Sequence, residues 1–196
     1  MTTIGLVRHG VTEWNELGKV QGKSNIPLNE RGRQQAFALA NRLALEESWD
    51  FIFSSDLTRA VETTNIISTK LGLSDIYFDE RIREIDCGEI EGTNEQDRVS
   101  KWGSEWRSLE LGMESFEDVS KRGTNFLEEI VEKYKGKRIL VVSHGAIISL
   151  TLNDIVPEDK ENYERFDADI TEVYEKEITP IEKKAGGETF TELPCW

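Results

Sequence analysis

The two histidines of this sequence stand in the same local context. Each follows a short apolar run and precedes a glycine, in the segments Leu6-Val7-Arg8-His9-Gly10 and Val141-Val142-Ser143-His144-Gly145. Such runs are typical of buried strands, and ligands of open α/β sheets bind beyond the carboxyl ends of their strands. A single histidine at a strand end is most often a satisfied polar group, but a matched pair favours chemistry. A neutral imidazole is a nucleophile, and the arginine beside it binds anions.

The rest of the chain is strongly acidic. Its 196 residues include 38 acidic and 24 basic side chains, which gives a formal charge of -14. This charge repels nucleic acid and anionic lipid, so we expect neither a nucleic-acid partner nor a membrane partner. It also repels small anions, so a phosphate site requires a local group of cations. The positions of the arginine residues are therefore diagnostic of such a phosphate site.

Length and composition predict one domain over residues 1–196, large enough to bury a core without disulfides. No apolar stretch approaches the roughly 20 residues of a membrane helix, and no leader of the signal-peptide type is evident. Cys87 and Cys195 lie far apart without metal-type spacing, which favours free thiols. We therefore expect a cytoplasmic protein. The sequence carries no signal for its oligomeric state.

Strand and helix patterns alternate along the chain. Helical spacing of apolar residues predicts helices after the N-cap Asn29, over residues 56–71, and after a capping box at Ser115. Apolar runs predict further strands at 50–55, 76–78 and 170–174, whereas 81–92 is expected to form an ordered loop and 183–187 a turn or tail. Crossover helices between strands imply a three-layer α/β/α fold around a mostly parallel sheet.

Residues 93–113 are expected to form a lid-like insert over the crevice. Trp102 and Trp106 are four residues apart, so a single helix face would carry both indole rings. Gly103 and Gly112 weaken the prediction of a helix here.

Two further polar segments lie between the histidine motifs. They are Ser54-Ser55-Asp56-Leu57-x-Arg59-Ala60-x-x-Thr63 and Arg83-Glu84-Ile85-x-x-Gly88-x-x-Glu91-Gly92. Together and in this order, over roughly residues 2–155, the motifs resemble the histidine phosphatase superfamily, also called the phosphoglycerate mutase-like family. The resemblance implies a phosphoglycerate mutase-like fold and hydrolysis of a small-molecule phosphomonoester, with no cofactor and no metal.

The chemistry of phosphomonoesters explains why these residue types are needed. Donors must hold the anionic oxygens while a nucleophile attacks in line with the leaving oxygen. Arg8 and Arg59 have planar forks that suit phosphate oxygens. By resemblance, His9 forms a phosphohistidine, while His144 binds the phosphoryl group and stabilises the charge of the transition state. Either a backbone carbonyl or a carboxylate is expected to orient His9 through its other ring nitrogen.

Glu84 matches the family position of the proton donor. One carboxyl group can protonate the leaving oxygen and then activate water, and Glu91 and Glu13 are weaker alternatives for this role. The resemblance also predicts the residues that bind the substrate, namely Arg8, Asn15, Gln21, Gly22, Arg59, His144 and Gly145.

The sequence departs from the family pattern beside these motifs. Val11 stands where a polar residue is usual, and the segment from Cys87 to Gly92 has Ile90 where an aromatic residue is common. None of these departures removes a catalytic group, but they leave the subclass and the lining of the pocket open.

Three alternatives to a phosphatase remain at this point. Cofactor-dependent phosphoglycerate mutases resemble the chain but typically carry a longer insertion after the Glu84 motif, where this chain has only about twenty residues between Gly92 and Ser115. A non-catalytic phosphate-binding regulatory module would not need both a nucleophile and an acid. Zinc coordination by the two histidines and nearby acids lacks the usual ligand spacing.

Overall fold

The structure, a computed structural model, describes residues 2–46, 48–155 and 173–178. Within these ranges the chain forms a five-stranded sheet in the order β3-β2-β4-β1-β5. The bounds are β1 Thr2–Arg8, β2 Phe51–Ser54, β3 Ile76–Phe78, β4 Arg138–Ser143 and β5 Val173–Ile178. The first four strands are parallel, whereas β5 pairs antiparallel with β1 at one edge. The predicted mostly parallel sheet is confirmed.

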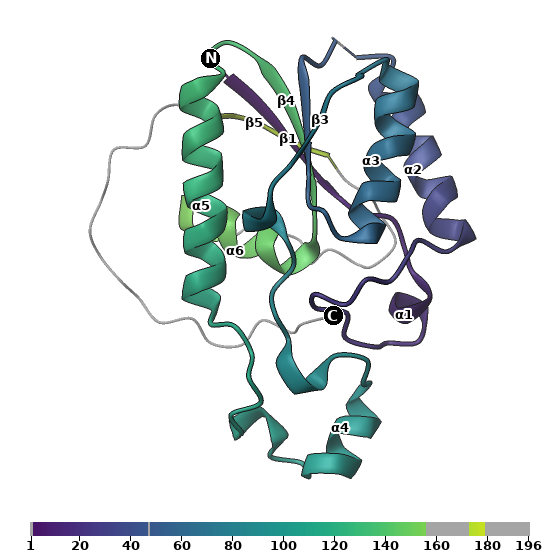
Figure 1. The fold of residues 1–196 in the computed structure, drawn as a ribbon, viewed down its shortest axis with the longest axis vertical. Helices are drawn as coiled ribbons and strands as arrows, with labels where there is room; N and C mark the ends of the chain where they lie inside the picture. The colour runs from purple at the N-terminus through teal and green to yellow at the C-terminus, as the bar shows by residue number, and fades with distance from the viewer. Residues whose placement is uncertain (1, 47, 156–172, 179–196) are drawn as a thin grey trace.

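Helices cover both faces of this sheet (Figure 1). α2 (Glu30–Leu43) and α3 (Thr58–Leu71) pack together on one face, and α5 (Phe116–Lys133) and α6 (Gly145–Ile155) pack together on the other. Alternate strand residues divide between these faces. Val7, Ile52, Leu140 and Val142 join the α2/α3 core, and Leu6, Phe53, Ile139 and Val141 join the α5/α6 core. The three-layer α/β/α fold is confirmed.

The N-termini of the helices show how local and distant caps differ. Asn29 caps α2 by accepting a hydrogen bond from the amide of Gly32 at 2.8 Å. α3 begins at Thr58, two residues later than predicted, and Asn25 from a distant loop accepts the amide hydrogen of Thr58. A cap of that kind leaves no local pattern in the sequence.

Two of the α-helices in the described ranges were not predicted. α1 (Glu13–Glu16) is a single turn closed by a capping box between Thr12 and Asn15. α6 contains a largely apolar run with β-branched residues and buries several of its sides, so it lacks the polar stripe that reveals an amphipathic helix. In the described ranges no helix is long and apolar enough to cross a membrane.

The insert after the Glu84 loop differs from its prediction. α4 (Glu95–Trp102) ends at Gly103, whose φ is +84°, and Trp106 begins a separate short 3-10 helix, η3 (Trp106–Ser108). The prediction that one helix face carries both indole rings is therefore wrong, because the glycine turns the chain. Trp106 is buried in the same apolar cluster as Ile85 and Ile90, so this part of the insert anchors the preceding loop. A lid function stays a prediction.

Some expectations concern residues beyond the described ranges. The predicted final strand at 170–174 corresponds to β5, but its first three residues lie outside the described part of the chain, as do the turn at 183–187 and Cys195. The loop at 81–92 lies within the described part. It begins inside the short 3-10 helix η1 (Glu80–Ile82) and contains a second one, η2 (Gly88–Ile90). The organisation as one domain stays a prediction.

Candidate active site

The two histidine motifs end neighbouring parallel strands. Arg8 at the end of β1 is in register with Ser143 at the end of β4, so the next residues of both strands emerge at one edge. The imidazole rings of His9 and His144 are both buried, with their centroids 5.1 Å apart. The structure thus brings together the two histidines that the sequence predicts as a pair.

Two hydrogen bonds define the tautomer of His9. Its Nδ1 lies 2.7 Å from the carbonyl oxygen of Gly10, which can only accept, so Nδ1 carries the proton. Nε2 therefore has the lone pair, and it accepts a hydrogen bond from Nε of Arg59 at 3.1 Å. The orienting group that the sequence left open is thus a backbone carbonyl, and Nε2 is the nucleophilic atom of the ring.

Both histidines are held in their neutral form. Burial, followed by the positive charges of Arg59 and Arg8, holds the pKa of His9 well below its usual 6.5, although the Gly10 carbonyl acts in the opposite direction. Burial and the charge of Arg59 lower the pKa of His144 in the same way. Neutral imidazole is therefore available at His9 throughout the neutral pH range.

Ser55 orients the second histidine. Its hydroxyl oxygen accepts a hydrogen bond from the amide of Leu57, and it lies 2.8 Å from Nε2 of His144. The hydroxyl can donate its proton to Nε2, and in that arrangement the ring proton is on Nδ1. Within the described residues this buried Nδ1 has no hydrogen-bond partner, so it is available to donate to a phosphoryl oxygen. The motif contained Ser55, but the sequence did not suggest this role.

The two arginines differ in how many of their donors are committed. Arg59 is fully buried, and it donates to the carbonyls of Gly22 and Ser24 at 2.8 Å as well as to His9. Three of the five N–H groups of its guanidinium are thus used and two remain. Burial lowers the pKa of Arg59 to about 10, so it stays charged at neutral pH.

The guanidinium of Arg8 uses fewer of its N–H groups in hydrogen bonds than that of Arg59. In the described part of the chain its guanidinium makes no hydrogen bond, and burial lowers its pKa while the charge of Glu84 raises it. A Cβ atom at Gly145 would lie 3.4 Å from Nε of Arg8, so the glycine leaves space beside this side chain. Arg8 is therefore ready to bind an anion at the end of β1.

Glu84 lies at the amino end of α6. Its Oε1 accepts hydrogen bonds from the amides of Ile85 and Ile147 at 3.0 and 3.2 Å, and its Oε2 accepts one from Ala146 at 3.3 Å. A helix amino end favours a negative group there. This places the carboxyl group beside Gly145, at the same end of the sheet as His144 and Arg8.

Comparison with known proteins agrees with this geometry. The family model of the histidine phosphatase superfamily (branch 1) matches residues 4–186. The chain belongs to this family. It is 36% identical over 157 residues to a metal-independent phosphoserine phosphatase of Arabidopsis thaliana, a match of 76% of this chain and 66% of that protein, so the chain spans about two thirds of its length.

Two further relatives are similar over more of their length. A probable phosphoglycerate mutase, GpmB of Escherichia coli, is 37% identical over 165 residues, covering 80% of this chain and 75% of its own. The crystal structure of a phosphoserine phosphatase of Entamoeba histolytica, in complex with 3-phosphoglyceric acid, is 30% identical with a TM-score of 0.72. That match covers 89% of this chain and 90% of the other. Phosphatases are thus among the relatives of this histidine phosphatase.

The rim of the histidine phosphatase site is a loop at residues 21–25. The side-chain oxygen of Gln21 accepts from the hydroxyl of Thr12 at 3.0 Å, and that of Asn15 accepts from the Thr12 amide at the same distance. Both oxygens accept from Thr12, so the NH2 groups of Gln21 and Asn15 are the donors left for a phosphate. Gly22 contributes its carbonyl to Arg59 and has a φ of +50°.

Glu91 holds this rim loop. Its Oε1 accepts from the amide of Lys23 at 2.8 Å and its Oε2 from the hydroxyl of Ser24 at 2.5 Å. A Cβ atom at Gly22 would lie only 2.0 Å from Oε1 of Glu91, so a larger residue there would displace the Glu91 carboxylate from these contacts. These contacts commit Glu91 to the loop, which disfavours it as the alternative acid. Glu13 is exposed on α1.

The segment that follows His9 lies directly on the backbone of α2. A Cβ atom at Gly10 would come within 2.4 Å of the carbonyl oxygen of Gly32, and one at Gly32 within 2.0 Å of that of Val11. Val11, the departure from the family pattern, is itself buried. Ile90, the second departure, lies in the apolar cluster with Trp106. Both departures therefore line the core beside the histidine phosphatase site.

Proposed function

We propose that this histidine phosphatase hydrolyses small phosphomonoesters without a metal ion, through a phosphohistidine at Nε2 of His9. The observation that supports the proposal most directly is the pair of hydrogen bonds on the His9 ring, with the Gly10 carbonyl at Nδ1 and Arg59 at Nε2. The cation beside Nε2 attracts an anionic substrate and repels a metal ion. The same arrangement therefore favours phosphoryl transfer over zinc binding.

The first step transfers the phosphoryl group to the enzyme. Arg8, the two remaining N–H groups of Arg59 and the Nδ1–H of His144 bind the phosphoryl oxygens. The lone pair of Nε2 forms the N–P bond as the ester P–O bond breaks, and the leaving oxygen takes a proton from Glu84.

The second step returns the site to its starting state. The carboxylate of Glu84 takes a proton from water, the water oxygen attacks phosphorus, and the N–P bond breaks to release inorganic phosphate. His9 regains its lone pair and Glu84 its proton. One carboxyl group thus acts as an acid and then as a base.

The relatives and the site support a choice of candidate substrates. Phosphoserine and 3-phosphoglyceric acid are bound by structural relatives of this chain, so both belong in a panel of phosphomonoesters ranked by kcat/KM. Because one relative is a probable phosphoglycerate mutase, the panel also includes interconversion of phosphoglycerates with a bisphosphoglycerate primer. Primer-dependent interconversion that exceeds hydrolysis would favour the mutase. We also propose a cytoplasmic location, which the low cysteine content supports.

Intact mass spectrometry tests the proposed intermediate. Glu84→Gln enzyme mixed with p-nitrophenyl phosphate is expected to accumulate a phosphoryl adduct, because an aryl leaving group needs little protonation while attack by water still needs a base. The adduct is expected to be labile to acid, as phosphohistidine is. His9→Ala is expected to form no adduct and to lose hydrolysis while keeping the thermal unfolding transition of the unmodified protein. Appreciable turnover by a folded His9→Ala enzyme would refute the assignment.

A further inference from the structure

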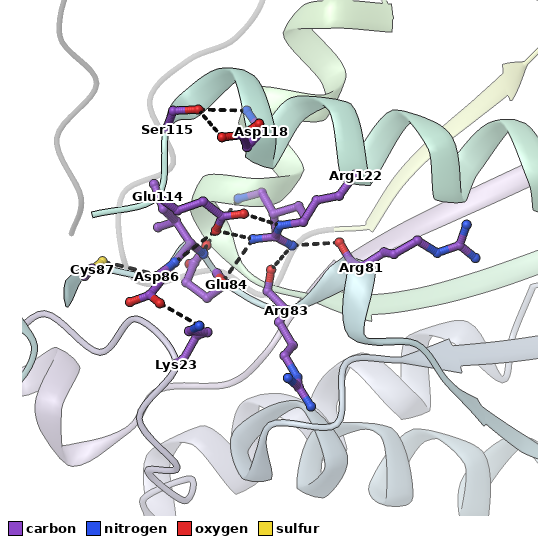
Figure 2. A network of polar contacts seen from close by, with 12 residues as sticks. Lys23, Arg81, Arg83, Glu84, Asp86, Cys87, Glu114, Ser115, Asp118 and Arg122 are labelled. Atoms are coloured by element: carbon purple, nitrogen blue, oxygen red, sulfur yellow. Dashed lines mark hydrogen bonds and ion pairs between the residues drawn. The ribbon is translucent and has the colours of Figure 1, made fainter. Parts of the chain in front are cut away.

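Arg122 lies on α5, and its side chain reaches the loop that carries Glu84 (Figure 2). Its side chain is only 19% exposed. One terminal nitrogen, Nη1, donates to the carbonyls of Arg81 and Arg83 at 2.7 and 2.6 Å. The other, Nη2, donates to the carbonyl of Glu84 at 3.1 Å and to Oε2 of Glu114 at 3.0 Å, and Nε donates to Oε1 of Glu114 at 2.8 Å. All five N–H groups of this guanidinium are therefore used.

These bonds act on the backbone on either side of Glu84. The carbonyls of Arg83 and Glu84 belong to the two peptide groups that flank the Cα atom of Glu84. Fixing both peptide planes sets φ and ψ of this residue, and hence the direction in which its side chain leaves the chain. The loop is irregular here, since Arg83 follows η1 in an extended conformation, and Arg122 supplies the partners that regular structure would supply elsewhere.

Glu84 is thus held from two directions. Arg122 of α5 binds its carbonyl, and the first amides of α6 bind its carboxylate. Glu114 completes the arrangement, because it pairs with the guanidinium and accepts the amide hydrogen of Asp86, two residues after Glu84, at 3.1 Å. Figure 2 shows Arg122 between Glu114 and the carbonyls of Arg81 and Arg83.

We propose that Arg122 is a positioning residue for proton transfer, which holds the carboxyl group of Glu84 within reach of the leaving oxygen. The inference rests on the proposed function of Glu84. The step concerned is the first one, in which the ester P–O bond breaks and the proton of Glu84 moves to the leaving oxygen. A displaced carboxyl group impairs this step most when the leaving group is a poor one.

Lysine cannot replace arginine in this role. Its ammonium group has three donors and no planar fork, so it can keep the charge next to Glu114 but cannot bind three carbonyls and a carboxylate together. Arg122→Lys therefore keeps the positive charge at this position but loses the set of hydrogen bonds to the loop. Arg81→Gln is a matched control, because Arg81 lies on the same loop and pairs instead with Asp79 and Glu129.

The test compares kcat/KM for p-nitrophenyl phosphate and for phosphoserine. This parameter reports the transfer to His9, whereas hydrolysis of the phosphoenzyme is common to both substrates. We expect Arg122→Lys to lower the value for phosphoserine by about 10- to 100-fold and that for the aryl ester by less than about threefold. Arg81→Gln is expected to leave the ratio of the two values unchanged, and Glu84→Gln is expected to change it in the same direction as Arg122→Lys.

Three outcomes separate the possibilities. The inference is supported if the ratio of the two kcat/KM values changes in Arg122→Lys and in Glu84→Gln but stays the same in Arg81→Gln. Equal losses on both substrates in a folded Arg122→Lys enzyme overturn it, because a purely structural role does not distinguish leaving groups. If Glu84→Gln itself leaves the ratio unchanged, the assignment of Glu84 is wrong instead. Arg122→Met, with a thermal unfolding scan, shows how much the same bonds stabilise the fold.

Discussion

Acidification from about pH 7.5 to about pH 5.5 is expected to destabilise this fold through its two buried histidines. Burial and the neighbouring arginines hold the pKa of His9 and of His144 well below the usual value. In the unfolded chain both imidazoles titrate near their usual pKa of about 6.5. The unfolded state therefore binds more protons than the folded state in this window. The free energy of unfolding is greatest above the unfolded pKa and decreases as the pH falls.

The magnitude follows from proton binding to the unfolded chain. An imidazole with a pKa of about 6.5 goes from about 0.1 to about 0.9 bound protons between these two pH values, which lowers the free energy of unfolding by about 1.4 kcal/mol. Two histidines that stay neutral in the folded state give about 2.7 kcal/mol. This is a large part of the roughly 5–15 kcal/mol by which domains are stable.

The carboxylates do not obscure this effect. Hydrogen bonds from Arg138 and Lys137 lower the pKa of Asp50, and those from Arg83 lower the pKa of Asp56. Groups of this kind contribute stability that is present above their unfolded pKa of about 3.9 and is lost as the pH falls further. The chosen window lies above that range. The chain has only two histidines, so the window reports on these two.

Urea unfolding at the two pH values, at constant ionic strength, measures the effect. The intact protein is expected to lose about 2.7 kcal/mol, and His144→Gln is expected to reduce the loss to about 1.4 kcal/mol, since one titrating group remains. A loss below about 1 kcal/mol in the intact protein would refute the reasoning, since it requires the folded state to protonate its histidines freely. If His144→Gln loses as much free energy of unfolding as the intact protein, His144 does not contribute to the pH effect.

Further predictions concern metal independence and the rim loop. Exhaustive chelation is expected to leave hydrolysis of p-nitrophenyl phosphate unchanged, whereas loss of activity restored by zinc would show a metal requirement. Gly22→Ala is expected to lower kcat/KM by about tenfold or more, because its Cβ atom presses on Glu91 and displaces the loop that holds Arg59. Gly18→Ala is the matched control, since Gly18 also has a positive φ but nothing within 4 Å of its Cβ position, and equal losses in the two variants would disprove the steric argument.

The sequence predicted the fold and the meeting of the motifs because both depend on periodic patterns. Two apolar runs that end in His9 and His144 become adjacent parallel strands, and parallel strands deliver their carboxyl ends to the same edge. Arg8 and Arg59 could be selected because they stand in the motifs and because cations matter in so acidic a chain. For these residues, position in an element and chemical type carry the information.

Other features depend on contacts that no local pattern records. Arg122 is 38 positions from Glu84 along the chain, and its donors bind backbone carbonyls, which have the same chemistry at every residue. The cap of α3 comes from Asn25, 33 positions away from Thr58. The four-residue spacing of Trp102 and Trp106 favoured one continuous helix through both. The structure separates them, because Gly103 has a positive φ and ends α4 between them. Tertiary contacts and backbone geometry decided these points.

The close packing of Gly10 on Gly32 changes how a map of variant effects on this protein should be interpreted. Neither residue has a reactive group, yet a side chain at either one would force the segment after His9 away from α2. A saturation scan is therefore expected to score Gly32 as severely as His9, and a catalytic role would be inferred wrongly from that score. Anyone who transplants this site to another scaffold must transfer a turn of helix that takes no part in the reaction.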